Sequence, residues 1–275
     1  MEMRAIKTKY FYLFIWPFLA LLACEDNLGN LTPDTVVVEA YLYVNQPVTN
    51  VRVTQLVPIG QNTTQPTPIN NAEIQINTNG QSYLLTPSAG DSGYYHYAGN
   101  DLAITAGESY SLEVKYQERV ITAITTAPVK PSGLALTKDT LRIAPIRSVI
   151  DIGNRQTEDL DVNWVNPSQD YHFVLVENIE VNPPRISPST DGGLGTLLPT
   201  DPIRGDSRQV VGAFLNEYGT HRVILFRINQ EYVDLYNSAE QDSRNLNEPL
   251  TNISNGLGIF TCINADTSSF FVRRP

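Results

Sequence analysis

The sequence predicts an all-β protein made of two consecutive β-sandwich modules, and three observations carry this prediction. Short apolar segments alternate with polar residues at a period of two along most of the chain, as half-buried strands do. The composition includes 18 Pro, 17 Gly and 14 Tyr, while charged residues make up 17%, too few for a coiled coil or a long solvated helix. A length of 275 residues suffices for two such modules.

The first 23 residues have the layout of a secretion signal. Basic residues within 1–9 precede an almost wholly apolar run over 10–23, which is short for a membrane span but suits a signal-peptide core. The tetrapeptide Leu21-Leu22-Ala23-Cys24 resembles the lipobox of bacterial lipoproteins. We therefore predict cleavage before Cys24 and acylation of its thiol, with palmitate among the chains, anchoring the protein in the outer membrane. An ordinary secretory signal and an N-terminal anchor with an incidental cysteine are the alternatives.

The polar residues that follow, 24–34, are predicted to form a tether. Its acidic pair Glu25-Asp26 resembles the surface-export signal of bacteroidete-type lipoproteins, so the cell surface and a periplasm-facing position are both open. The net charge is −10 and becomes −12 once residues 1–23, which carry +2, are removed. Such an acidic chain argues against nucleic acid as a partner, because phosphate binding needs a dense basic surface.

The first module is predicted over 35–128. Asn79-Gly80 between two alternating segments is typical of a hairpin, because both central residues of a type I′ turn need positive φ. A polar loop is expected over 60–68, and Pro128 ends the module. The expected strands cover 36–43, 51–57, 72–77, 81–85, 93–97, 110–116 and 120–126.

The second module is predicted over 129–275. It contains a loop rich in Pro, Gly and Ser over 182–209 and one helix over 230–242, which Asn229 can cap. Trp164 is expected in the core of a central strand. The expected strands cover 134–143, 160–164, 171–176, 221–228, 256–263 and 268–272.

Several short segments stand in a fixed order along the mature chain: Val36–Ala40, Pro68–Ile74, Gly93–Tyr95, Ala106–Leu112, the Tyr232–Tyr236 helix and Asn252–Phe260. Together they resemble domain-of-unknown-function family four-two-four-nine of bacteroidete-type outer-membrane lipoproteins. The resemblance implies a transthyretin- or immunoglobulin-like sandwich followed by a fibronectin-III-like sandwich with one short helix. It also implies a TonB-dependent outer-membrane transporter as a partner, and it carries no catalytic or ligand residues.

No constellation for catalysis, metal or cofactor binding emerges from the spacing. His96, His172 and His221 are far apart, whereas a zinc site needs convergent ligands, so each is expected at a solvent-facing or partly buried strand position. Ser92 in Gly-Asp-Ser-Gly is read as part of a turn, because no base accompanies it. Cys262 lies in an apolar run and is expected to be buried.

The expected function is therefore non-enzymatic binding. The predicted role is a ligand- or partner-binding accessory subunit of a TonB-dependent nutrient-uptake system, with an adhesion or envelope-scaffold protein as the alternative and a surface hydrolase less favoured. The loops 60–68 and 182–209 are candidate contact surfaces. Tyr94, Tyr95 and Tyr97 are expected to pack in the core or at an edge, with ligand stacking as the alternative.

Overall fold

The computed structural model describes residues 35–57, 65–146, 156–186, 197–239 and 251–275. The predicted signal peptide, Cys24 and the tether lie outside these ranges. The all-β prediction is confirmed, because the described elements are strands apart from the α-helix α2 (Gln230–Ala239) and the short 3-10 helix η2 (Gly212–Phe214). Within the described ranges, neither helix has the length and apolar character needed to cross a bilayer.

The first module is a sandwich whose two layers, joined where β4 pairs with β5, face each other across a core of buried Val, Ile, Leu and Tyr side chains. Strand alternation places the even-numbered residues of β1 in this core and its odd-numbered residues on the outer face. One sheet contains β1 (Val36–Tyr43), β2 (Val51–Gln55) and β5 (Tyr94–His96). The other contains β3 (Glu73–Thr78), β4 (Gln81–Pro87), β6 (Ser109–Tyr116) and β7 (Arg119–Thr126).

The predicted hairpin at Asn79-Gly80 is confirmed. Thr78 pairs with Gln81, so these two residues form the whole connection between β3 and β4. Both have positive φ, 51° at Asn79 and 76° at Gly80, as a type I′ turn requires. This turn sets the register of the two strands.

The second module packs a second pair of sheets around Trp164, which is buried as expected. One sheet contains β8 (Ser132–Leu136), β10 (Leu160–Val165) and β13 (Ser207–Val210). The other contains β11 (Tyr171–Asn178), β12 (Leu197–Pro199), β14 (Gly219–Ile228), β9 (Thr140–Arg142) and β15 (Leu257–Arg273).

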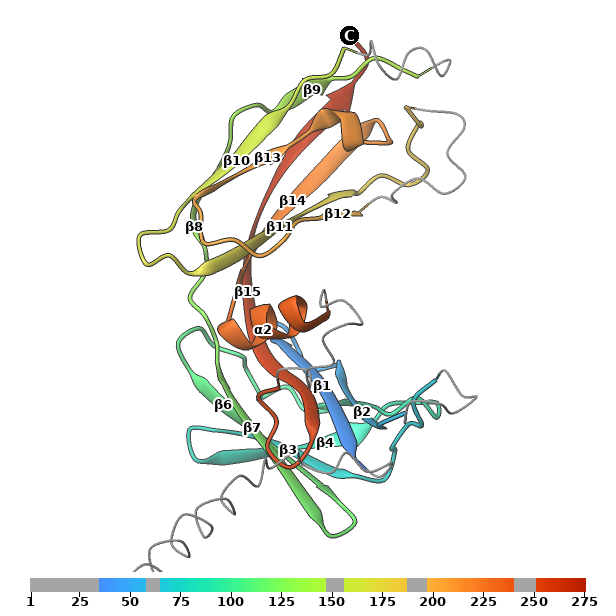
Figure 1. Cartoon of the computed structure of the whole chain (residues 1–275), viewed down its shortest axis with the longest axis vertical. Coiled ribbons are helices and arrows are strands. Elements are labelled where there is room, and N and C mark those ends of the chain that lie inside the picture. Colours follow the sequence, from blue (N-terminus) through green and yellow to red (C-terminus); the bar gives the residue numbers. More distant parts are fainter. Residues whose placement is uncertain (1–34, 58–64, 147–155, 187–196, 240–250) are drawn as a thin grey trace, which may run out of the picture.

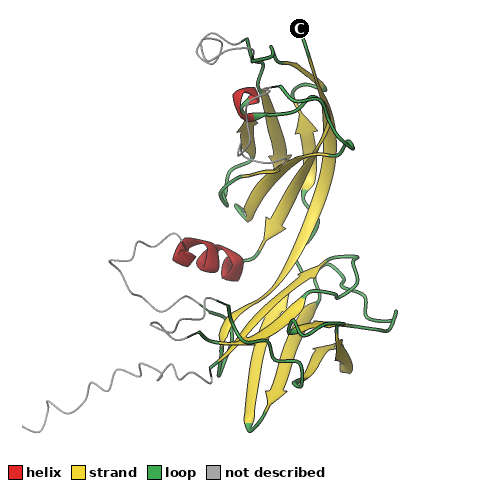
Figure 2. Cartoon of the chain, turned by 90° about the vertical axis from the view of Figure 1, so that its right-hand side faces the viewer, coloured by secondary structure: helices red, strands yellow, loops and turns green. Residues whose placement is uncertain are grey.

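The last strand, β15, belongs to both modules (Figures 1 and 2). Its first part pairs in parallel with β1 from Val37–Leu257 to Tyr43–Ile263. Its second part pairs antiparallel with β14, from Arg227–Asn264 to Gly219–Val272. The strand is 17 residues long, and at roughly 3.3 Å per residue it spans about 55 Å.

This continuity differs from the predicted pair of strands over 256–263 and 268–272. The intervening residues 264–267 include Asn264, Ala265 and Asp266, which have weak β propensity. They remain extended because each faces a partner on β14. The predicted boundary between the modules at residue 128 also needs one correction. Ile253, Phe260 and Cys262 come after this boundary but pack in the core of the first module.

Other elements depart from the sequence expectations more locally. The segment 134–143 forms two strands, β8 and β9, which join different sheets. The expected loop 182–209 contains β12 and the start of β13, while its residues 187–196 lie outside the described part of the chain. The predicted helix 230–242 is described over Gln230–Ala239.

Asn229 precedes the helix as expected, but its side chain has a different role. Its backbone carbonyl accepts from the N–H groups of Tyr232 and Val233, as an N-cap carbonyl does. Its side-chain amide instead donates to the Thr126 carbonyl at 2.8 Å, at the end of β7 in the first module. The residue therefore starts the helix and also ties the helix to the neighbouring module.

Gly258 of β15 lies directly against the backbone of β1 at Val38. Its φ is +110°, and a Cβ built there lies 2.0 Å from the Val38 carbonyl oxygen. We expect Gly258→Ala to lower the free energy of unfolding by at least about 3 kcal/mol, because it adds a backbone clash to the strain of positive φ. Urea denaturation monitored by circular dichroism measures this loss.

The matched control is Gly90→Ala. Gly90 also has positive φ, +90°, but a Cβ there meets nothing within 4 Å. This variant carries the strain alone and should lose about 1–2 kcal/mol. Equal losses for the two variants would show that the contact between β15 and β1 does not constrain the fold.

Candidate binding groove at the junction of the two modules

Aromatic side chains connect the two modules where β15 passes from one to the other. Tyr232 of α2 meets the ring of Tyr41 on β1 edge-on, with centroids 6.5 Å apart. It also stacks on Phe173 of β11 at 5.6 Å, and Phe173 stacks on Phe226 of β14 at 4.6 Å. The helix α2 thus lies between the outer faces of the two sandwiches, as Figure 1 shows.

Burial raises the pKa of the phenol groups at this junction. It raises the pKa of Tyr41 to about 12, and Glu39 adds to the effect through its charge. Burial likewise raises the pKa of Tyr43 and of Tyr232. All three hydroxyls therefore remain neutral hydrogen-bonding groups at any physiological pH.

Hydrogen bonds to the Glu231 carboxylate also attach the helix α2 to the first module. Its Oε1 accepts from the Thr125 hydroxyl at 2.6 Å and from the Thr261 hydroxyl at 3.2 Å. The Asn229 amide donates to the same oxygen at 3.1 Å. Thr125 belongs to β7 and Thr261 to β15, so this carboxylate joins the helix to two strands of the first module.

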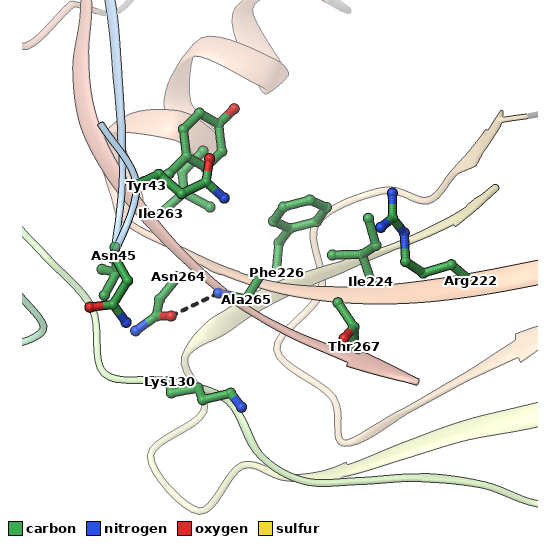
Figure 3. A pocket seen from close by; sticks show the side chains of 12 residues that line it. Tyr43, Asn45, Lys130, Arg222, Ile224, Phe226, Ile263, Asn264, Ala265 and Thr267 are labelled. Atoms are coloured by element: carbon green, nitrogen blue, oxygen red, sulfur yellow. Dashed lines mark hydrogen bonds between the residues drawn. The ribbon is translucent and has the colours of Figure 1, made fainter. Parts of the chain in front are cut away.

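Next to the aromatic chain lies a hollow of about 510 Å³ (Figure 3). Tyr43 and the turn after β1 form one side of it, and the outer faces of β14 and β15 form the other, so the hollow exists because of the way the modules meet. Its volume lies in the range of small-ligand sites, roughly 300–1,000 Å³. The lining residues are Tyr43, Val44, Asn45, Gln46, Lys130, Arg222, Ile224, Phe226, Ile263, Asn264, Ala265 and Thr267.

The two cations in this lining already have anionic partners. Lys130 Nζ lies 2.8 Å from Asp266 Oδ1. Arg222 contacts Glu177 through Nε, which donates at 2.6 Å, and through its terminal nitrogen. The hollow therefore combines apolar and aromatic surface with neutral polar groups and balanced charges.

A second hollow of about 440 Å³ adjoins the first. Asn45 and Gln46 line both, so the two hollows meet at the turn that follows β1. Backbone hydrogen bonds hold this turn, from Asn45 N to the Ile104 carbonyl and from Gln46 N to the Tyr43 carbonyl. The remaining lining residues are Pro47, Val48, Tyr97, Gly99, Asn100, Leu102, Ala103 and Ile104. We call the two hollows together the junction groove.

The three tyrosines singled out in the sequence have different places. Tyr95 is fully buried, and its hydroxyl donates to the Ile69 carbonyl and accepts from Ala72 N–H, so it packs in the core. Tyr94 is 39% exposed beneath the Arg52 guanidinium. Tyr97 lines the second hollow, and its hydroxyl donates to Asp101 at 2.5 Å.

Two of the histidines are more deeply buried than expected. His172 and His221 face the core of the second module, next to Trp164 and Phe270 respectively, and burial lowers the pKa of both. His96 is half-buried and contacts Ser88. In the described part of the chain, no three His, Cys, Asp or Glu side chains converge as a metal site would require.

Cys262 is fully buried as expected, and desolvation raises the pKa of its thiol to about 12. Cys24, the predicted lipid attachment site, lies outside the described residues. Residues 58–64, which include most of the predicted loop 60–68, and residues 187–196 of the loop 182–209 lie outside them too.

Sequence reasoning singled out Tyr97 but missed the other residues that form the junction groove. One signal was present, because Tyr41 and Tyr43 occupy the outward positions of β1, where polar side chains are usual. The partners of these tyrosines come from β11, β14 and α2, about 130 to 190 residues later in the chain. No short-range pattern links segments so far apart.

The match to protein families agrees with the resemblance seen in the sequence. The model of the family described as domain of unknown function (DUF4249) matches residues 24–269. The chain belongs to this family. Among curated proteins, none matches the DUF4249 chain significantly.

Solved structures show weak similarity to this DUF4249 protein. The chicken CNTN1 FN1–FN3 domains are 11% identical with a TM-score of 0.26, over 72% of this chain and 60% of the other. A bacterial ice-binding adhesin that is retained on the host cell surface is 14% identical with a TM-score of 0.20, over 88% of this chain and 66% of the other. The chain thus spans less than two thirds of the length of either structure.

Glu231 is expected to stabilise the junction through the three donors that converge on it. Glu231→Ala removes their shared acceptor and leaves the buried Thr261 hydroxyl unpaired, which should cost about 2 kcal/mol of unfolding free energy. Asp234→Ala on the same helix is the control, because that carboxylate accepts from Gln230 at an exposed site. Its effect should stay within about 0.5 kcal/mol. Chemical denaturation measures both, and indistinguishable variants would contradict the assigned role.

Proposed function

We propose that this protein is a lipid-anchored, non-enzymatic binding protein of the outer membrane that acts as an accessory subunit of a TonB-dependent nutrient-uptake system. Acylation at Cys24 attaches it to the membrane, and the junction groove is its binding surface. The observation that carries the binding role is the groove itself, whose first hollow is lined by residues of both sandwiches. The membrane and the transporter partner follow from the lipobox and from the family resemblance.

The course of the chain supports a defined orientation relative to such an anchor. β1 starts at Val36, close in sequence to the proposed attachment site, and ends at Tyr43 beside the groove. β15 runs parallel to β1 and continues into the second module, so both strands lead away from the anchored end. The first module would then lie next to the membrane, with the groove and the second module further out.

The contacts at the junction support a binding surface of constant shape. The stacked rings of Tyr232, Phe173 and Phe226 and the hydrogen bonds to Glu231 cross between elements of both modules. A groove whose walls are held in this way loses little conformational entropy when a ligand binds.

The anchor is tested by Cys24→Ala. We expect the unchanged protein to incorporate labelled palmitate in cells and to sediment with membranes, and the variant to lose both properties, because the acylated thiol is the sole attachment proposed. Cys262→Ala is the matched control and should retain the label, since its buried thiol is not the acceptor. Label that persists in Cys24→Ala would overturn the lipoprotein assignment.

The accessory role is tested by purification from membranes in mild detergent. We expect a TonB-dependent transporter to co-purify with the protein, and Cys24→Ala to recover less of it, because an anchored partner is held at high local concentration. Recovery of the protein alone, after cross-linking as well as without it, would contradict the proposed partnership.

A further inference from the structure

Three exposed side-chain amides surround the junction groove without partners of their own. Asn45 and Gln46 line both hollows, and Asn100 lines the second. Among the described residues, none donates to or accepts from these three amide groups. Asn264, in the same lining, differs because its amide donates to the Pro128 carbonyl. Each free amide presents a donor and an acceptor side by side.

Aromatic surface accompanies these amides in both hollows. Tyr43 and Phe226 line the first hollow, and Tyr97 lines the second. The hydrogen bond from Tyr97 to Asp101 and the stacking of Phe226 on Phe173 hold two of these rings in place. Fixed aromatic faces beside donor–acceptor pairs suit a ligand that has both apolar C–H surface and many hydroxyl groups.

The charges of the groove favour a neutral ligand. Lys130 and Arg222 are each compensated by a carboxylate, Asp266 and Glu177 respectively, and no carboxylate is among the lining residues of either hollow. A charged ligand would have to break one of these ion pairs or go without a counter-charge. A neutral polar ligand meets neither cost.

The backbone around the groove disfavours an extended peptide. Strand addition needs free N–H and C=O groups along a sheet edge. Beside the first hollow, the N–H groups of Ala265 and Thr267 already donate to the Asn264 and Asp266 side chains, each at 2.9 Å. β1 is paired with β15 on one side and with β2 on the other.

We propose that the junction groove is an elongated site for a neutral oligosaccharide. The sugar rings lie against Tyr43, Phe226 and Tyr97, and the amides of Asn45, Gln46 and Asn100 bind their hydroxyl groups. The two hollows, which meet at Asn45 and Gln46, accommodate successive units of one chain. This assignment of a ligand class rests on the proposed binding role and makes it more specific.

Isothermal titration calorimetry of the full-length protein in detergent tests the assignment. The probes are the neutral hexasaccharides maltohexaose, cellohexaose, xylohexaose and mannohexaose, with hexagalacturonate as an anionic comparison and a capped hexapeptide of alternating Ser and Ala as a neutral peptide. We expect at least one neutral hexasaccharide to bind with a Kd below about 1 mM, and more tightly than the other two probes.

The double variant Asn45→Gly with Gln46→Ala should weaken that binding about tenfold, because it removes two amide partners of the sugar. Glycine preserves the backbone at position 45, where φ is 61°. Asn79→Gly is the matched control, since Asn79 also has positive φ but lies in the β3–β4 hairpin, and it should bind as the unchanged protein does. Circular dichroism checks that each variant is folded.

Absence of binding by every neutral hexasaccharide, tighter binding of hexagalacturonate or of the peptide, or unchanged affinity in the double variant would each overturn the oligosaccharide assignment. These results can be separated from the accessory role. If the transporter complex forms but no sugar binds, only the oligosaccharide assignment is contradicted. If a sugar binds but no transporter complex is found, the accessory role is contradicted and the oligosaccharide site is supported.

Discussion

The architecture depends on one strand pairing with two partners in succession. The parallel contact of β15 with β1 completes the first sandwich, and its antiparallel contact with β14 completes the second. Because the backbone stays extended through Asn264–Thr267, the modules have no flexible linker at this point and their relative orientation is set by the strand itself. The close approach of Gly258 to Val38 shows how tightly the shared strand is held.

The shared strand also links the stabilities of the two modules. Phe260 and Cys262 are fully buried in the first core, and Phe270 and Val272 are buried in the second, although all four lie within one element. Release of β15 would expose apolar surface in both modules at once, and burial of such side chains stabilises by about 1.5–3 kcal/mol each. Both sandwiches therefore need β15 to be complete.

The junction groove follows from the same constraint. The end of β1, the helix α2 and the outer faces of β14 and β15 come together because β15 passes among them (Figures 1 and 3). Aromatic stacking and the polar cluster at Glu231 close the junction on the helix side. The hollows open at the turn after β1, where the amides of Asn45 and Gln46 face solvent. The two cations that line the groove, Lys130 and Arg222, are each paired with a carboxylate, in a protein whose overall net charge is −10.

The sequence by itself determined the elements whose signals are local. Alternation of apolar side chains predicted β1, β10 and β11, the dipeptide Asn79-Gly80 predicted the β3–β4 hairpin, and the spacing of apolar residues after Asn229 predicted the helix. Each of these depends on neighbours within about ten residues, so it is readable without knowing the fold.

Tertiary structure alone decided how these elements combine. Residues 264–267 fall between two strands expected from the sequence, and they are strand because pairing with β14 outweighs the weak β propensity of Asn264, Ala265 and Asp266. Tyr41 and Phe226, nearly two hundred residues apart, take part in one aromatic chain because β15 brings their strands to the same junction. Propensity acts over a few residues, whereas the pairing of distant strands depends on the folding of the whole chain. The junction groove is a product of that pairing.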